Sequence, residues 1–89
     1  MSMFGANPDE LQALGGTLRR QIAAVEEIIR SVDGPVNGIA WTGPARERFL
    51  DEWNGSFKTA LGRLNDAFEA AGADCINRAD GLRAVMGVG

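Results

Sequence analysis

Carboxylates and a thiol are the side chains of this 89-residue chain that could do chemistry. Adjacent acidic residues occur at Glu26-Glu27 and at Asp51-Glu52. Paired carboxylates often serve as the general acid and the general base of an enzyme. Neighbouring residues of a helix diverge by about 100° around its axis, so two such carboxylates cannot converge on one reacting atom. We interpret both pairs as solvated helix faces.

Cysteine and histidine usage excludes further chemistry. Cys75 is the single cysteine and the chain has no histidine, so there is no imidazole base and no ordinary zinc cluster. No cation flanks Cys75 to activate it, which favours a bystander thiol, although it could still bridge two chains. No glycine-rich phosphate loop with its lysine is present. The sequence therefore predicts a protein that is not an enzyme and has no cofactor or metal.

Charge and hydropathy exclude other partners. The net charge of -3 argues against a nucleic-acid partner, because binding to phosphates needs clustered cations. The apolar stretches are shorter than the roughly 20 residues of a membrane-spanning helix. The first basic residue is Arg19, which is not typical of a secretory signal peptide. A soluble interaction protein is the class that remains.

A first helix is expected over residues 8–33, after an N-terminal arm of residues 1–7. Asn7 is a good N-cap, Pro8 suits the first helical position, and acidic residues follow in the first turn. Gly15-Gly16 interrupts the helix, either as a tolerated weak spot or as a place where another helix comes close. Gly34 and Pro35 are expected to end it. Apolar residues recur at steps of three or four at Leu11, Leu14, Leu18, Ile22, Val25, Ile29 and Val32.

A loop over residues 34–43 is then expected to lead into a second helix over residues 44–86 that begins at Pro44. Its apolar positions follow the same spacing, at Phe49, Trp53, Phe57, Leu61, Leu64, Phe68, Ala71, Cys75, Ala79, Leu82 and Met86. The pattern predicts an all-α protein with one helical hairpin domain, 8–86. Because the second helix is much the longer, we expect the segment beyond about residue 72 to be mobile or dependent on a partner.

The turn carries the most specific motif of the chain. Trp41-Thr42-Gly43 lies between two amphipathic helices, and this combination resembles the WXG family, the early-secreted-antigen-like proteins of type VII secretion in actinobacteria and firmicutes. The resemblance covers almost the whole chain. It implies that two hairpins pair into an antiparallel four-helix bundle, and that a membrane ATPase complex exports the folded dimer from the cytoplasm without a cleaved signal peptide. It also implies that the Trp41 turn is an export motif.

The resemblance implies a set of interface residues and a partner. The hairpin and dimer interfaces are expected to use Leu11, Leu14, Leu18, Ile22, Val25, Ile29, Phe49, Trp53, Phe57, Leu61, Leu64 and Phe68. Many members, or their partners, carry a tyrosine shortly before an acidic residue after the second helix, and this chain has no tyrosine. Ile76 and Asp80 are either a degenerate form of that element or an ordinary helix pair. A different hairpin that supplies the tyrosine is therefore slightly favoured over a second identical chain.

Several alternatives stay open at this point. Trp41 is either a hydrophobic plug over the end of the hairpin or part of a surface that a partner recognises. The leading function is a secreted effector, or the carrier partner of one. A second possibility is a membrane-active effector released when the dimer dissociates, although the few cations give little attraction to anionic lipid. A third is a helical adaptor or chaperone partner that is never exported.

Overall fold

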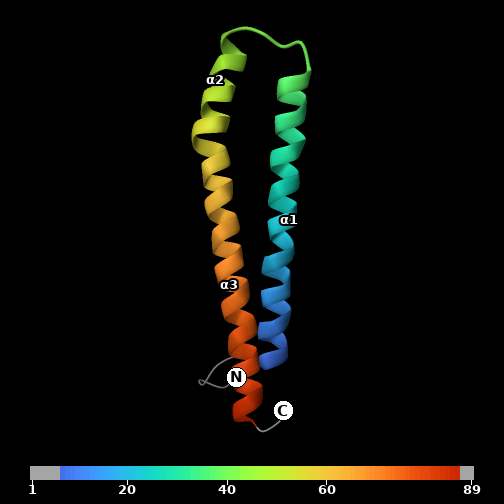
Figure 1. Cartoon of the computed structure of the whole chain (residues 1–89), viewed down its shortest axis with the longest axis vertical. Coiled ribbons are helices and arrows are strands. Elements are labelled where there is room, and N and C mark those ends of the chain that lie inside the picture. Colours follow the sequence, from blue (N-terminus) through green and yellow to red (C-terminus); the bar gives the residue numbers. More distant parts are fainter. Residues whose placement is uncertain (1–6, 87–89) are drawn as a thin grey trace.

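The computed structural model describes residues 7–86 and is a hairpin of two long antiparallel helical arms (Figure 1). The first arm is α1 (Pro8–Gly38). The second arm consists of α2 (Pro44–Glu52), a π-helical turn (Trp53–Phe57) and α3 (Lys58–Val85), which continue one another. The hairpin measures 63 × 20 × 18 Å, and its radius of gyration is 19.4 Å, whereas a compact domain of this length would have about 12 Å. The predicted all-α hairpin is confirmed.

The start of α1 lies where the sequence predicts it. The Asn7 side chain accepts hydrogen bonds from the backbone N–H of Asp9 at 2.7 Å and of Glu10 at 3.4 Å. These bonds satisfy two of the N–H groups that a helix leaves free at its first turn. Pro8, which follows the cap, has no N–H to satisfy. The rest of the predicted N-terminal arm, residues 1–6, lies outside the described residues.

The predicted end of the first helix at residue 33 is wrong, because α1 runs through Gly34 and Pro35 to Gly38. A proline inside a helix loses one backbone hydrogen bond and costs about 3 kcal/mol. Two features offset this cost. The Val36 side chain is buried, and the Asn37 side chain donates a hydrogen bond of 2.8 Å to the Asp33 carbonyl. The loop therefore shrinks from residues 34–43 to residues 39–43.

The second arm is not a uniform α-helix, because it contains the π-helical turn Trp53–Phe57. Its sequence explains the turn. Phe49, Trp53, Phe57 and Leu61 are four residues apart each time, and each such step drifts by about 40° around an α-helix. A π-turn accommodates one extra residue and cancels most of the accumulated drift. The turn thus keeps the aromatic rings before it and the aliphatic chains after it facing α1.

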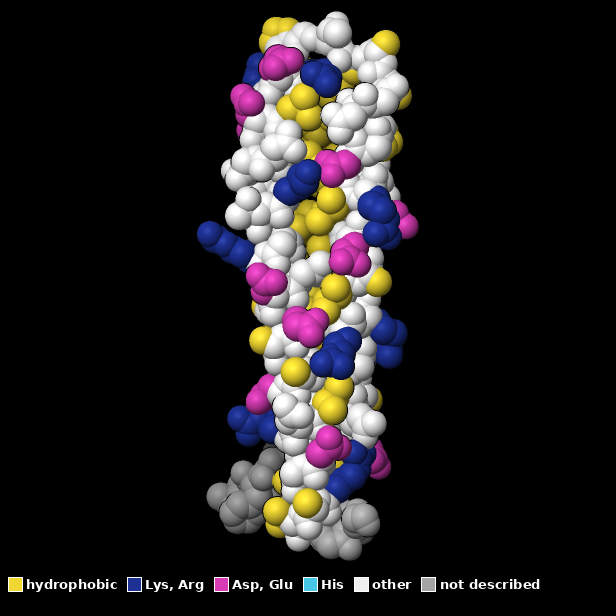
Figure 2. Space-filling model, in the orientation of Figure 1, with side chains coloured by type: hydrophobic (Ala, Val, Ile, Leu, Met, Phe, Trp, Pro, Cys, Tyr) yellow, Lys and Arg dark blue, Asp and Glu magenta, His cyan; other side chains and the backbone are white. Residues whose placement is uncertain are grey.

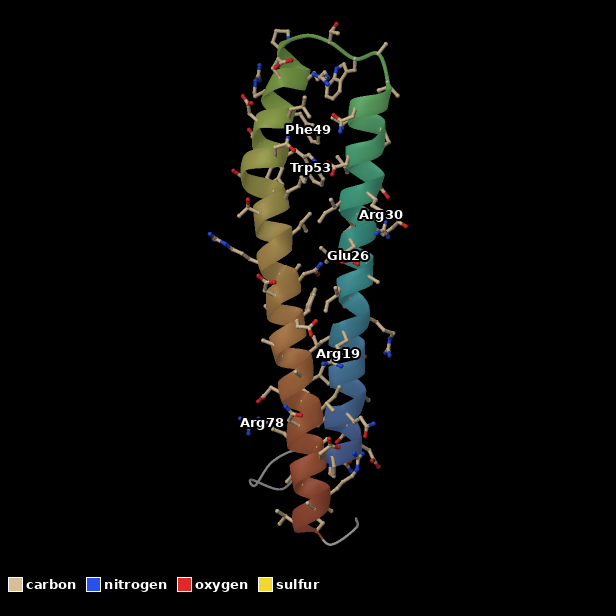
Figure 3. All side chains as sticks on the ribbon, viewed as in Figure 1. Arg19, Glu26, Arg30, Phe49, Trp53 and Arg78 are labelled. Carbon is tan, nitrogen blue, oxygen red and sulfur yellow. The ribbon has the colours of Figure 1, made fainter. Side chains whose placement is uncertain are left out.

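The two arms taper from a wide loop end to a narrow opposite end, as Figure 1 shows. No Cα atom of α2 lies within 8 Å of a Cα atom of α1, because the large rings of Phe49 and Trp53 project between the two arms there (Figure 3). At the narrow end Gly15 and Gly72 are both buried. A Cβ on Gly15 would lie 2.9 Å from the Gly72 carbonyl oxygen. Of the two alternatives for Gly15, the structure therefore shows close helix approach.

The segment beyond about residue 72, which the sequence predicts to be mobile or dependent on a partner, packs on α1 within the hairpin. Ala79 is fully buried, and the Arg83 guanidinium contacts the Asp9 carboxylate at 2.7 Å. The reason is the longer α1, whose 31 residues span about 46 Å and reach most of the second arm. Only the last residues extend past it, and Val85 is 87% exposed.

Candidate interaction site

The Trp41 turn owes its shape to Gly43. This glycine has a φ of +118° and caps α2, a backbone conformation that a residue with a Cβ adopts only under strain. Its carbonyl accepts the first bond of the helix, from the Glu47 N–H at 3.2 Å. The backbone N–H of Trp41 bonds to the Ile39 carbonyl at 3.0 Å. The glycine of the motif is therefore a requirement of the backbone at the start of α2.

Trp41 is the end of a short aromatic stack. Its ring lies 6.2 Å from that of Phe49 in a tilted arrangement, and Phe49 stacks on Trp53 at 6.0 Å. Aromatic pairs at such distances add about 0.5–1.5 kcal/mol beyond the area they bury. Trp53 is buried, whereas Trp41 is half-buried. Trp41 therefore packs on Phe49 at the loop end of the hairpin and remains partly exposed.

Asp33 joins this stack to α1. Its carboxylate accepts hydrogen bonds from the Trp53 indole N–H at 2.7 Å and from the Lys58 ammonium at 3.0 Å. The Trp53 hydrogen bond first, then the Lys58 hydrogen bond, lower the pKa of Asp33 below its ordinary value of 3.8; burial opposes this shift, and the charge of Lys58 adds to it. Asp33 therefore stays ionised at neutral pH and holds two side chains of the second arm.

One face of the hairpin is free of charge through the middle of the molecule. In each arm, the positions that point toward the other arm form the seam. The residue directly before each of these positions lies to one side of the seam. Because the two arms are antiparallel, these sides of both arms form one face. We call it the uncharged face. Toward the two ends the same rule gives charged residues, such as Glu10, Glu52 and Asp74, but over residues 14–28 and 60–71 all the members are uncharged and exposed. They are Leu14, Thr17, Gln21, Ala24 and Ile28 of α1, and Ala60, Leu64, Ala67 and Ala71 of α3.

The opposite face is charged. Residues that immediately follow a seam position include Arg19, Glu26, Arg30, Asp66 and Glu69. Figure 2 shows a face on which side chains of both charge signs flank a narrow apolar strip between the arms. The uncharged face differs from this one because it exposes large apolar side chains. Leu14, Ile28 and Leu64 on it are 48%, 50% and 42% exposed. Exposed apolar surface is a common feature of interaction sites, which makes the uncharged face the candidate.

The predicted interface residues divide between the seam and the surface. Val25 and Trp53 are buried, whereas Leu14, Leu64 and Phe57 are among the exposed large hydrophobic residues. The half-buried ones are Leu11, Leu18, Ile22, Ile29, Phe49, Leu61 and Phe68. Phe57, which is 46% exposed, lies about two turns before Leu64 and so adjoins the uncharged face.

The pair Ile76 and Asp80 takes two different positions. Ile76 packs in the seam beside Gly15, where a Cβ on the glycine would come within 2.8 Å of the isoleucine side chain. Asp80 is exposed, and its nearest cation is Arg83, 3.8 Å away. The thiol-bearing Cys75 is half-buried next to the same close approach.

The sequence reasoning missed the polar groups at the seam. Asp33 and Lys58 bridge the arms, and the Asn65 amide N–H donates to the Ile22 carbonyl at 3.4 Å while its own oxygen is buried without a partner. The run of apolar residues spaced by four was the available signal for the π-turn, and hence for Lys58. No pattern of apolar residues can reveal Asn65, because it occupies a position that such a pattern leaves blank.

Other kinds of site have little support in the described part of the chain. Within residues 7–86, no three or more potential ligand side chains gather in a way that could hold a metal ion. No helix there has the length and hydropathy to cross a membrane. Comparisons with protein-family models, with curated proteins and with solved structures found no match to this chain.

Proposed function

We propose that this chain is a WXG-type hairpin that a type VII secretion system exports, and that it acts by pairing, as a secreted effector or as the carrier of one. The uncharged face carries the proposal. It gives a hairpin with a thin core a second apolar surface, and a four-helix bundle is the simplest arrangement that covers such a surface on both partners.

The large accessible surface area supports the proposal that the hairpin is one half of a larger assembly. The hairpin exposes 6251 Å², whereas a folded monomer of this mass would expose about 5,000 Å². The excess is comparable with the roughly 800 Å² that each partner buries in a standard interface. Alanines on the uncharged face, such as Ala60, Ala67 and Ala71, let a second pair of helices approach closely without large side chains in between.

The proposed partner is another WXG-type hairpin, with a different chain slightly favoured because this one has no tyrosine. Such a partner would bring its own tyrosine element next to the half-buried Trp41. In the absence of that chain, the same uncharged face would pair with a second copy. The secretion ATPase would then recognise the folded dimer at the Trp41 turn.

The export proposal is tested in an actinobacterial host that has a type VII system, and in a matched strain without its membrane ATPase. We expect the tagged chain in the culture supernatant of the first strain only, with a cytoplasmic marker retained in the cells. Trp41→Ala should stay in the cells while its circular dichroism is unchanged. Ile39→Ala, at the most exposed large residue of the same turn (61% exposed), is the control and should be exported.

Equal amounts of the chain in the two supernatants would contradict export by this route. Retention in both strains would favour the adaptor or chaperone alternative. Export of Trp41→Ala at the normal level would show that Trp41 is only a plug over the end of the hairpin.

A further inference from the structure

The π-turn and the Asp33 carboxylate depend on each other. Trp53 and Lys58 are five residues apart, and in an α-helix they would point about 140° away from each other. The π-turn closes a bond between the Lys58 N–H and the Trp53 carbonyl, which brings the two residues onto nearly the same side of the arm. Only in this register can both side chains reach Asp33, as they do at 2.7 Å and 3.0 Å.

The two helices on either side of the π-turn are anchored very differently. α3 packs on α1 through the Gly15–Gly72 approach and through the Arg83–Asp9 ion pair. α2 has no Cα atom within 8 Å of α1, and none of its residues is buried. On the π-turn side it is attached by the backbone hydrogen bonds from the Trp53 N–H to the Phe49 and Leu50 carbonyls, and by the stack of Phe49 on Trp53. If the π-turn relaxed to an α-helix, α2 would therefore be the part that moves.

We propose that Asp33 is a register latch for the second arm. While it holds Trp53 and Lys58, the π-turn persists and α2 presents Phe49 to α1. When its bonds to these two side chains break, the π-turn becomes α-helical. α2 then rotates relative to α3 by about 100°, the angle of one helical residue. That rotation carries Phe49, and with it the Trp41 turn, away from its place over the end of the hairpin. The latch depends on contacts within the hairpin and is independent of the export proposal.

The latch is tested by distances between spin labels in the full chain. Cys75→Ala removes the native thiol, and Glu27→Cys with Arg48→Cys places exposed labels on α1 and α2. Labelled chain is diluted with unlabelled chain so that only distances within one molecule are measured. Because a helix with side chains is about 10–12 Å wide, Asp33→Ala should shift this distance by roughly 5–10 Å. The control pair Glu27→Cys with Asp66→Cys reports on α3 and should not change.

A deletion separates the latch from general loosening. Removing the exposed Ser56 takes the extra residue out of the π-turn, so that Trp53 and Lys58 become four residues apart and share one side of an ordinary α-helix. In this background there is no second register to adopt. Asp33→Ala should therefore shift the Glu27–Arg48 distance in the full-length chain and leave it unchanged in the Ser56 deletion.

Three results would overturn the latch. An unchanged Glu27–Arg48 distance in Asp33→Ala would show that the register does not depend on Asp33. A change in the control pair as well would show that the whole hairpin opens. The same shift in the Ser56 deletion would show that α2 moves without any change of register.

Discussion

Gly15 and Gly72 face each other across the seam with no room for a methyl group on either. A Cβ on Gly72 would lie 2.9 Å from the Arg19 side chain and 3.1 Å from the Gly15 carbonyl oxygen. The neighbouring Gly16 has its nearest such contact at 3.4 Å, with the far end of Arg20. The narrow end of the hairpin therefore depends on two particular glycines and not on the third.

This contact predicts opposite effects for similar substitutions. Gly15→Ala and Gly72→Ala should each lower the free energy of unfolding by about 1–3 kcal/mol, because the added methyl forces the helices apart. Gly62→Ala, where nothing lies within 4 Å of the new Cβ, should raise it by up to about 1 kcal/mol through helix propensity. Urea unfolding followed by circular dichroism measures all three. Equal gains for the three variants would contradict the close approach.

The Trp41 turn predicts a strong requirement for glycine at position 43. Gly43→Ala should cost about 1–3 kcal/mol, because its φ of +118° is unfavourable for any residue with a Cβ. Gly38→Ala, at the last residue of α1 with open space around its Cβ, is the matched control and should be neutral or stabilising. Thermal unfolding compares the two. If both variants melted at the same temperature, Gly43 would not have a positive φ.

The ionised Asp33 predicts a particular pH dependence. Because the folded-state pKa lies below 3.8, the carboxylate adds stability that is fully present above the ordinary pKa and is lost as the pH falls through the lowered one. The stability difference between the wild type and Asp33→Asn should be constant from pH 7 to about pH 5 and should shrink below pH 3.8. Urea titrations of both proteins at each pH cancel the effect of the other carboxylates. A difference that grew in acid would contradict the assignment.

Hydrogen exchange tests the packing of the C-terminal segment. Amides around the buried Gly72 and Ala79 should be protected almost as well as those around Val25, because all three lie in the same seam. Protection should fall off only near Val85, which extends past α1. Rapid exchange from residue 73 onward in a hairpin that is otherwise protected would restore the idea of a segment without a partner.

The sequence predicts the elements of this fold better than their ends and irregularities. Asn7 and Pro8 determine the helix start by local chemistry, and the structure agrees. The local stop signal of Gly34 and Pro35 is overridden by a tertiary contact, the burial of Val36, which no local rule contains. Because the predicted end of α1 is too early, the predicted helix is too short. The expectation about the C-terminal segment is a consequence of that shorter length.

The candidate site was accessible to sequence reasoning only in part. The Trp41 motif can be recognised in the sequence, but the positive φ that requires glycine at position 43 is a property of the folded turn. The apolar stripe predicts one interface, whereas antiparallel packing separates Val25, in the seam, from Leu14 and Leu64, which are exposed on the uncharged face. This distinction needs the register between the two arms, which a single sequence does not supply.

Association through the uncharged face is tested most directly by sedimentation equilibrium over a hundredfold concentration range. Ala67 and Ala70 are both exposed alanines of α3, but Ala67 lies on the uncharged face and Ala70 points away from the seam. The average mass of the wild type and of Ala70→Glu should rise above the monomer value of 9.5 kDa, while Ala67→Glu should stay there. A wild type that remains monomeric throughout, or two glutamate variants that behave alike, would contradict association through this face.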